Sequence, residues 1–503
     1  MAKTKKHTPA KKKPTPTVST GTVACWEDDP GDPKSQPVLT PIHVPAPNQA
    51  ATPLPYKLSG KTPPAQVDPL GTREFLFYAN ACALRRTADF WGRIVPAGTK
   101  WEIGKVLPVN VDSGEDLNAF YTRGDGGDTP GLHFFHDEVS GRVYFSGESP
   151  DIASHEMGHA VLDAIRPQLF DAQTIEAAAF HESFGDMSAL LSALQVESFR
   201  QALLSETRGK LHRSSRLSRL AEQLGAAIRI VAPDSADPDC LRNAFNSFFY
   251  RDPQTLPPSA PASQLSSEAH SFSRVFTGAF LDIVAGIFAA QASQDSAALQ
   301  QTSEDAAHIL LGGILNAAIV PDYFSQVAAN IVQFADGAPF NGKYRDVLKG
   351  SLIRRGILSL KAANTISTMK PQTMRLTAAA SARDKQPAQL PKATIAANNF
   401  GLKQSVLKVH MASEPKTLGV TGSALVLGAL EPRSSQNAAE VYTENLFVRG
   451  HVDAGTHRDP ERGVHHPHTF KTHKIFEEAG ELVLRRISFN CGFSHRNGEV
   501  TYN

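Results

Sequence analysis

The stretch SHEMGHAVLDA, residues 154–164, limits most strongly what this chain can fold into. The pattern predicts a helix that ends before Pro167. His155 and His159 would then lie one turn apart, with both imidazoles on one face of the helix. Two histidines at this spacing supply two of the three protein ligands of a hydrolytic zinc site, and Glu156 lies beside the metal. The HExxH pattern arises by chance in roughly a few per cent of chains of this length, so the assignment needs support from elsewhere.

A second helical segment, AAAFHESFGDMSALL, supplies that support. Glu182 and Asp186 are again one turn apart, and apolar residues such as Phe180 and Phe184 surround them. Carboxylates in such a setting are expected to be buried and to need a cation or a hydrogen-bond donor. We predict Glu182 as the third zinc ligand and Asp186 as the partner of the outer nitrogen of a ligand histidine. The alternative for this pair is a solvated helix face.

HEMGH followed by HESFGD resembles the gluzincin metalloproteases and, more narrowly, the thermolysin family. DLNAFYT resembles the family's edge strand, which implies that Asn118 and Ala119 contact the substrate backbone. CLRNAF resembles the segment with the substrate-binding arginine, here Arg242, and EAHSFSRVFTGAF the segment with the transition-state histidine, here His270. The resemblance covers roughly residues 70–358, with the motifs in the family's order.

Each of these added residues has a plainer interpretation when it is taken alone. Arg242 would be an ordinary surface arginine, His270 a helix cap or a core histidine, and Asn118 a turn residue. Only their order and spacing along the chain favour the functional interpretation.

The order of patterns predicts an α+β chain, with short aromatic strands before Pro150 and helical periodicity after it. The resemblance implies a two-lobed thermolysin-like zincin with the active-site helix between the lobes. The β-rich N-terminal lobe is expected at 66–166 and the helical C-terminal lobe at 167–358. Residues 1–65, rich in Pro, Thr and Lys, are expected to form a disordered basic tail. Residues 359–503 carry strand-like pieces and are expected to form a separate, β-rich accessory region: SVLKVHM, SALVLGAL, NLFVRGHV and GELVLRRISF.

The activity that the resemblance implies is zinc-dependent endopeptidase cleavage of a peptide or protein. Zinc polarises the peptide carbonyl and activates a water molecule, and Glu156 takes the water proton and later gives it to the departing amine. His270 donates to the oxyanion as charge develops on it, and Arg242 braces a carbonyl on the leaving-group side.

The sequence departs from the family in three places. No tyrosine stands between the second zinc histidine and the glutamate ligand, where the family has a second oxyanion donor, and Phe170 lies near the expected place. Loss of one such donor costs on the order of a hundredfold in rate. Glu268 is the only acid just before His270 that is available to orient it. MSALLSALQV, which follows Asp186, contains no carboxylate, so we expect one zinc per chain without the family's double calcium site.

Two other functions remain open. The absent tyrosine and the accessory region are compatible with a catalytically weak or inactive zinc-fold protein that acts as a binding or scaffold module, although an intact Glu156 favours the enzyme. A zinc aminopeptidase shares HExxH and the distant glutamate, but the chain has no GxMEN-like stretch to anchor a free amine.

Charge and hydropathy restrict the partners. A formal net charge of +1 argues against a general polyanion binder, and the lysines gathered near the N-terminus read as a solvated tail, so no nucleic-acid partner is expected. The chain has no run of about eighteen apolar residues and no signal-peptide pattern, so no membrane span is expected. Cytoplasm is the default compartment, secretion without a cleaved signal stays open, and nothing indicates the oligomeric state.

The cysteines and histidines outside these motifs predict no further metal site. The four cysteines are far apart and form no CxxC pair, which suggests neither a disulfide framework nor a cysteine metal site: Cys25, Cys82, Cys240 and Cys491. The segment RGHVDAGTHRDPERGVHHPHTFKTH, at 449–473, is rich in histidine and could bind a metal. A polar loop is the preferred interpretation, because no regular spacing organises these histidines.

Overall fold

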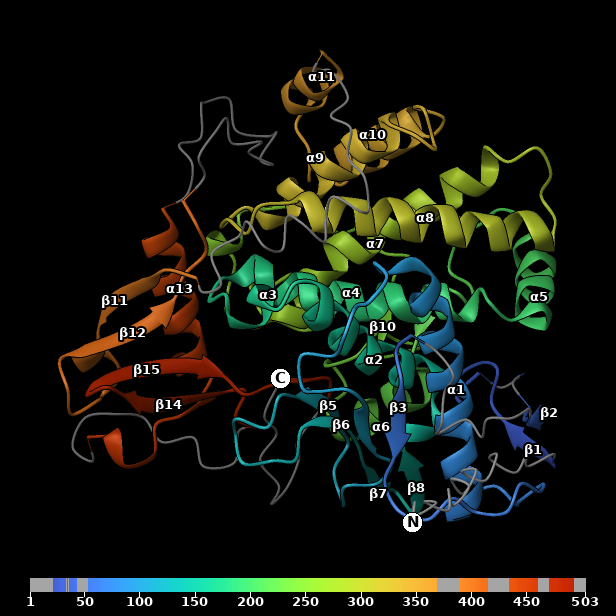
Figure 1. Cartoon of the computed structure of the whole chain (residues 1–503), viewed down its shortest axis with the longest axis horizontal. Helices are drawn as coiled ribbons and strands as arrows, with labels where there is room; N and C mark the ends of the chain where they lie inside the picture. Colours follow the sequence, from blue (N-terminus) through green and yellow to red (C-terminus); the bar gives the residue numbers. More distant parts are fainter. Residues whose placement is uncertain are drawn as a thin grey trace, which may run out of the picture.

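The computed structural model describes residues 21–32, 34, 36–42, 53–368, 390–414, 434–459 and 470–492. The chain is a mixed α+β protein, as the patterns predict. Figure 1 shows a strand-rich part around β3 to β8, a helical part above it, and a second sheet to the left that the C-terminal region forms.

The strand-rich part is built on a five-stranded sheet with the order β16-β5-β6-β4-β3. β5 and β6 run antiparallel, whereas β4 is parallel to both β3 and β6. All four residues of β5 and of β6 are buried, so both faces of the sheet are covered here, and α2 is one of the elements that pack on it. The strands span Tyr56–Leu58 (β3), Leu107–Asn110 (β4), Ala119–Thr122 (β5), Gly131–Phe134 (β6) and Ser488–Asn490 (β16), and a separate hairpin joins His136–Val139 (β7) to Arg142–Phe145 (β8).

The expectation of a disordered tail over 1–65 is wrong for the residues that the structure describes. Gly21–Cys25 (β1) and Val38–Ile42 (β2) pair antiparallel, and β3 belongs to the central sheet. Two sets of buried contacts tie the segment after Gly21 to the fold. β1 packs on α1, where Val23 and Trp26 are buried. The carboxylate of the fully buried Asp29 accepts hydrogen bonds from the Ser149 hydroxyl and, at 2.8 Å, from the backbone N–H of Gln223.

The predicted helical segments after Pro150 are confirmed. Ser149 caps the N-terminus of α2 and Thr174 that of α4, each by accepting from a backbone N–H of the first turn. Every residue of α4 is buried, so it forms the centre of the helical part, between α2 and α7. The helices are α1 Arg73–Ile94, α2 Pro150–Ile165, α3 Gln168–Asp171, α4 Ile175–Ala193, α5 Glu197–Thr207, α6 Glu222–Val231, α7 Ala269–Ala289, α8 Ser296–Asn316, α9 Tyr323–Asp336, α10 Arg345–Arg354 and α11 Leu360–Thr368, and Arg219–Leu220 (β9) pairs with Arg242–Asn243 (β10).

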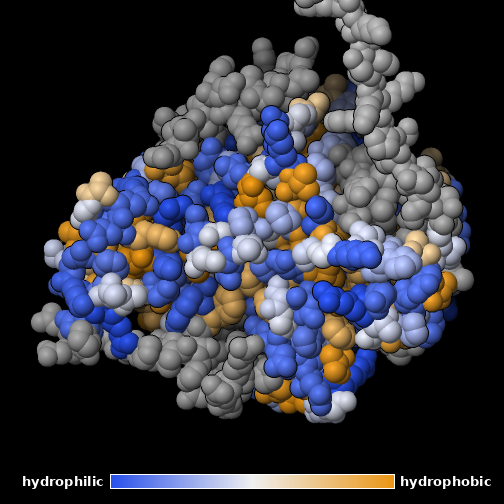
Figure 2. All heavy atoms as spheres, turned by 60° about the horizontal axis from the view of Figure 1, so that its bottom comes forward, coloured by the Kyte–Doolittle hydropathy of each residue, from blue (hydrophilic) through white to orange (hydrophobic). Residues whose placement is uncertain are grey.

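Among the described residues, α7 is the one helix long and apolar enough to cross a membrane. It lies inside the helical part, where 89% of its apolar window is buried. On the face of the molecule in Figure 2, hydrophobic residues lie in small groups between hydrophilic ones.

The C-terminal region is less separate and less purely β than its sequence predicts. Its sheet has the order β11-β12-β15-β14-β13, which confirms strands at SVLKVHM and GELVLRR, but NLFV is helical and SALVLGAL lies outside the described residues. Its last strand, β16, crosses over to pair with β5 of the central sheet, so a boundary at 359 cuts one structural unit. The elements are β11 Lys392–Ala396, β12 Val406–His410, α13 Ser435–Val448, β13 Val452–Asp453, β14 His473–Glu478 and β15 Glu481–Arg486.

Candidate metal centre

Two glycines let the helices that carry the predicted ligands approach each other closely. A Cβ atom at Gly185 of α4 would lie 2.6 Å from the ring of His155, and one at Gly158 of α2 would lie 2.7 Å from the Ser188 hydroxyl oxygen. Any side chain at Gly185 would therefore displace a predicted ligand. The pair of glycines brings the histidine face of α2 against the Glu182 turn of α4.

The three predicted ligands converge at this contact. His155 Nε2 lies 3.3 Å and His159 Nε2 lies 3.7 Å from the same oxygen, Glu182 Oε2. Ligand atoms about 2.0–2.1 Å from a zinc ion at tetrahedral corners lie about 3.3 Å from one another, so the spacing fits one ion. All three side chains are buried. His155, His159 and Glu182 could thus hold a metal ion.

Asp186 holds the first histidine in place, as predicted. Its Oδ1 lies 3.0 Å from His155 Nδ1 and accepts a hydrogen bond of 3.0 Å from Arg242 Nη2, while Oδ2 accepts from the Thr277 hydroxyl. Burial alone would raise the pKa of Asp186, but Arg242 and His155 outweigh it and lower the pKa to about 2. The contact between Asp186 and His155 Nδ1 orients the imidazole so that Nε2 faces the other two predicted ligands.

Glu156 is a fully buried acid beside the predicted ligands. Neither carboxylate oxygen meets a nitrogen or oxygen donor in hydrogen-bonding geometry among the described residues, and the Cys491 thiol lies close enough to interact with it. Burial raises the pKa of Glu156 to about 7. A carboxylate in this state has the proton affinity that a general base needs near neutral pH.

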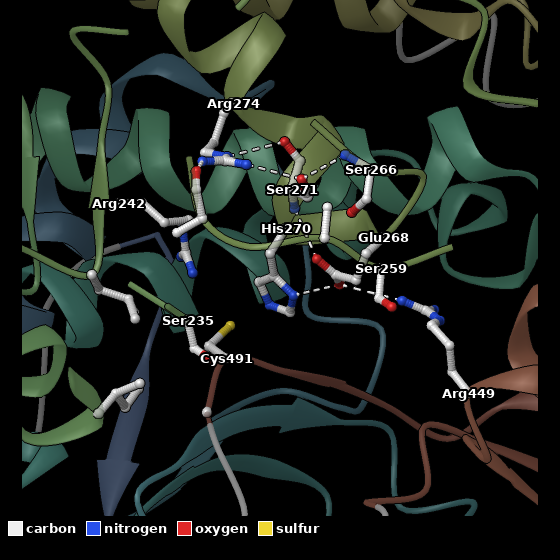
Figure 3. A pocket seen from close by; sticks show the side chains of 15 residues that line it. Ser235, Arg242, Ser259, Ser266, Glu268, His270, Ser271, Arg274, Arg449 and Cys491 are labelled. Atoms are coloured by element: carbon white, nitrogen blue, oxygen red, sulfur yellow. Dashed lines mark hydrogen bonds and ion pairs between the residues drawn. The ribbon is translucent and has the colours of Figure 1, made fainter. Parts of the chain in front are cut away.

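His270 faces the centre from the first turn of α7, and Figure 3 shows it with Glu268 beside it. His270 Nδ1 lies 2.9 Å from Glu268 Oε1, which confirms the predicted orienting acid, and His270 Nε2 lies 3.1 Å from Glu182 Oε2. Burial lowers the pKa of His270, but Glu182 and Glu268 outweigh it and raise the pKa to about 10. The two acids therefore favour the cationic imidazole, and Arg449, which caps the C-terminus of α13, lies 3.7 Å from Glu268 and adds positive charge from the C-terminal region.

Arg242 lines the same pocket as His270. Its ion pair with Asp186 uses Nη2, whereas its buried Nε has no acceptor among the described residues. One N–H of the guanidinium is thus available to a further acceptor.

The structure places Asn118 and Ala119 at the start of β5, beside the centre, but there they contact the chain's own C-terminal segment. Asn118 Nδ2 donates to Asn490 Oδ1 at 3.2 Å, and the Ala119 carbonyl accepts from the N–H of Cys491 at 2.9 Å. Phe170, near the expected place of the absent tyrosine, packs against the ring of Phe489.

Cys491 is the residue of this centre that the sequence analysis missed, and the expectation of no cysteine near a metal site is wrong. Its Sγ lies 3.0 Å from His155 Nε2, 3.5 Å from His159 Nε2 and 3.7 Å from Glu182 Oε2. It stands more than 300 positions from each of these residues and belongs to no CxxC pair. Only the pairing of β16 with β5 brings it here, and no local spacing encodes that pairing.

The histidine-rich segment forms no such group within the part of the chain that the structure describes. His451 and His473 are buried, and burial lowers the pKa of each. His465, His466 and His468 lie outside the described residues.

A scan against protein-family models finds no match to this chain, and a search of curated proteins finds none either.

Proposed function

We propose that this chain is a zinc-dependent endopeptidase of thermolysin-like organisation. The observation that carries the proposal is the buried group of His155, His159 and Glu182 with the buried carboxylate of Glu156 next to it. A metal site with only a structural role has no use for a further buried acid beside its ligands, because burial of an acid costs stability. Strands before α2 and helices after it support the two-lobed organisation.

Zinc is the metal that we infer from two imidazoles and a carboxylate, and when bound it would polarise a peptide carbonyl and activate water. Glu156 accepts the proton of the attacking water and passes it to the leaving amine. His270, kept cationic by Glu268, stabilises negative charge on the carbonyl oxygen. The free N–H of Arg242 Nε binds a substrate carbonyl, while Asn118 and Ala119 present β5 to the substrate backbone.

Cys491 favours a second candidate, a zinc-fold protein without catalysis. With the thiol included, four donor atoms surround the centre, and a structural zinc site is one with four protein ligands. The scaffold function therefore rests on a permanent Cys491 ligand, whereas the peptidase requires that the thiol can leave.

The test is metal analysis followed by cleavage of denatured casein, with and without a zinc chelator. Because the Cys491 thiol lies in the centre, full-length wild type and Cys491→Ser are assayed together, with Cys240→Ser as the matched control. The peptidase predicts about one zinc per chain and chelator-sensitive cleavage by Cys491→Ser. Bound zinc without cleavage by any of the three proteins would favour the scaffold.

A further inference from the structure

The edge of the central sheet nearest the metal centre is covered by the chain itself. β16 runs antiparallel to β5, with Ser488 opposite Thr122, Phe489 opposite Tyr121 and Asn490 opposite Phe120. The pairing continues past the strand, since the Cys491 N–H donates to the Ala119 carbonyl. A peptide that adds to a sheet edge makes the same backbone hydrogen bonds.

Side chains fix this segment as well as its backbone. Phe489 is 1% exposed and its ring stacks on His181 at a centroid distance of 4.0 Å and on His159 at 4.9 Å. On the other side of the strand, Asn490 accepts from Asn118. Gly492 completes the fit, because a Cβ atom there would lie 2.3 Å from Asn118 Cα.

This register delivers the Cys491 sulfur to the ligand atoms. Zinc–sulfur bonds are about 2.3 Å and zinc–nitrogen bonds about 2.0–2.1 Å, so tetrahedral sulfur and nitrogen ligands lie about 3.5 Å apart. The observed separation of 3.5 Å from His159 Nε2 matches this value, and the 3.0 Å to His155 Nε2 is about 0.5 Å shorter, so a small outward shift of the sulfur would accommodate one shared ion. Figure 3 shows Cys491 reaching into the pocket beside His270.

We propose that Ser488–Cys491 is a tethered substrate mimic that holds the peptidase in a latent state, with the Cys491 thiolate as the fourth ligand of the metal. The inference rests on the proposed function. The thiolate takes the coordination position that water needs, and β16 takes the sheet edge that a substrate needs. Activation is a displacement without covalent chemistry: the sulfur leaves, its place becomes open to water, and the strand vacates β5.

The segment is joined to the rest of the molecule in a way that permits this displacement. β16 is three residues long and follows β15 after the single residue Ile487. The C-terminal sheet, β11 to β15, forms its own ladder without β16. Release of β16 would therefore leave that sheet paired and would expose β5 as an edge.

The test uses the full chain loaded with cobalt(II), because a thiolate on cobalt gives a near-ultraviolet charge-transfer band that nitrogen and oxygen ligands do not. Wild type and Cys240→Ser are expected to show this band, and Cys491→Ser to lack it while keeping the visible cobalt bands. Acetohydroxamate is then added as a small metal ligand. It is expected to change the visible spectrum of Cys491→Ser at a concentration at least tenfold below that required for wild type.

Phe489→Ala, which keeps the thiol, is measured in parallel, so that the inference can be tested even if Cys491→Ser fails to fold. Its charge-transfer band is expected to weaken, with hydroxamate binding intermediate between the other two. Cobalt-loaded wild type without a thiolate band, or hydroxamate binding equal in wild type and both variants, would overturn the latent state. Failure of the proposed peptidase activity would give a different result. Cys491→Ser would then bind both cobalt and hydroxamate but would not cleave casein.

Discussion

Replacing Phe489 by alanine should open the metal centre without unfolding the chain. The Phe489 ring is buried between His181, His159 and Phe170, and the Arg486 guanidinium lies 4.1 Å from its centroid. Truncation of a buried phenylalanine to alanine costs about 3–5 kcal/mol. Because the loss falls only on the state in which β16 is docked, the population of the released state should rise by about two to nearly four orders of magnitude.

Alkylation of the cysteines in the native protein measures this population. A maleimide reacts with a buried thiol only when the structure around it opens, so its rate follows the free energy of that opening. Cys491 reports release of β16, and Cys240, which is fully buried elsewhere, reports opening of the structure away from β16 in the same sample. Peptide mass spectrometry gives both rates.

In Phe489→Ala, the Cys491 rate should rise by about a hundredfold or more while the Cys240 rate stays close to that of wild type. Equal acceleration of both thiols would mean that Phe489 stabilises the whole fold and not a releasable segment. An unchanged Cys491 rate would mean that packing of Phe489 does not keep the thiol in the centre.

The remaining predictions concern the contact between α2 and α4, the role of His270, the buried acid Glu148 and a peptide copied from the C-terminal segment. Gly185→Ala should displace His155 and lower the zinc content well below one per chain, whereas Gly350→Ala, where a Cβ atom meets nothing within 4 Å, should leave the zinc content unchanged. In the Cys491→Ser background, His270→Ala should lower kcat by about a hundredfold with little change in zinc content, and equal kcat values would remove His270 from the mechanism. Burial raises the pKa of Glu148 from 4.5 to about 7, so the folded state holds the extra proton and stability should fall as pH rises from about 4.5 to 7, by up to about 1.4 kcal/mol per pH unit. Glu148→Gln should flatten that slope in denaturant titrations, and identical slopes would contradict the assignment. A free peptide with the sequence ISFNCG, residues 487–492, should inhibit cleavage by Cys491→Ser more strongly than the same peptide with serine for cysteine.

The sequence alone predicts those parts of the metal centre that depend on helical periodicity. Two histidines one turn apart predict one face of α2, and two acids one turn apart predict one face of α4, and the structure brings both faces together. The nearby Glu268 could also be paired with His270, because they are two positions apart at a helix start. These relations depend on residues close together in the chain, so they can be predicted from a single sequence.

Long-range strand pairing explains what the sequence could not provide. The run that ends in β16 has the alternation of a strand, but nothing in it indicates which sheet it joins. The same holds for β1 and β2, which are tied to the fold by long-range contacts such as the packing of β1 on α1 and the hydrogen bond between Asp29 and Ser149. The sequence also predicts a strand where α13 forms, because Leu446, Phe447 and Val448 are compatible with either structure.

If Glu156 is the base of a zinc peptidase, the decisive variant is Glu156→Gln in the Cys491→Ser background. The change keeps the size and the polarity of the side chain and removes the proton acceptor. This variant should bind about one zinc per chain, as the parent does, and should cleave casein at a rate lower by about a hundredfold or more. Zinc retained together with undiminished cleavage would show that Glu156 is not the base.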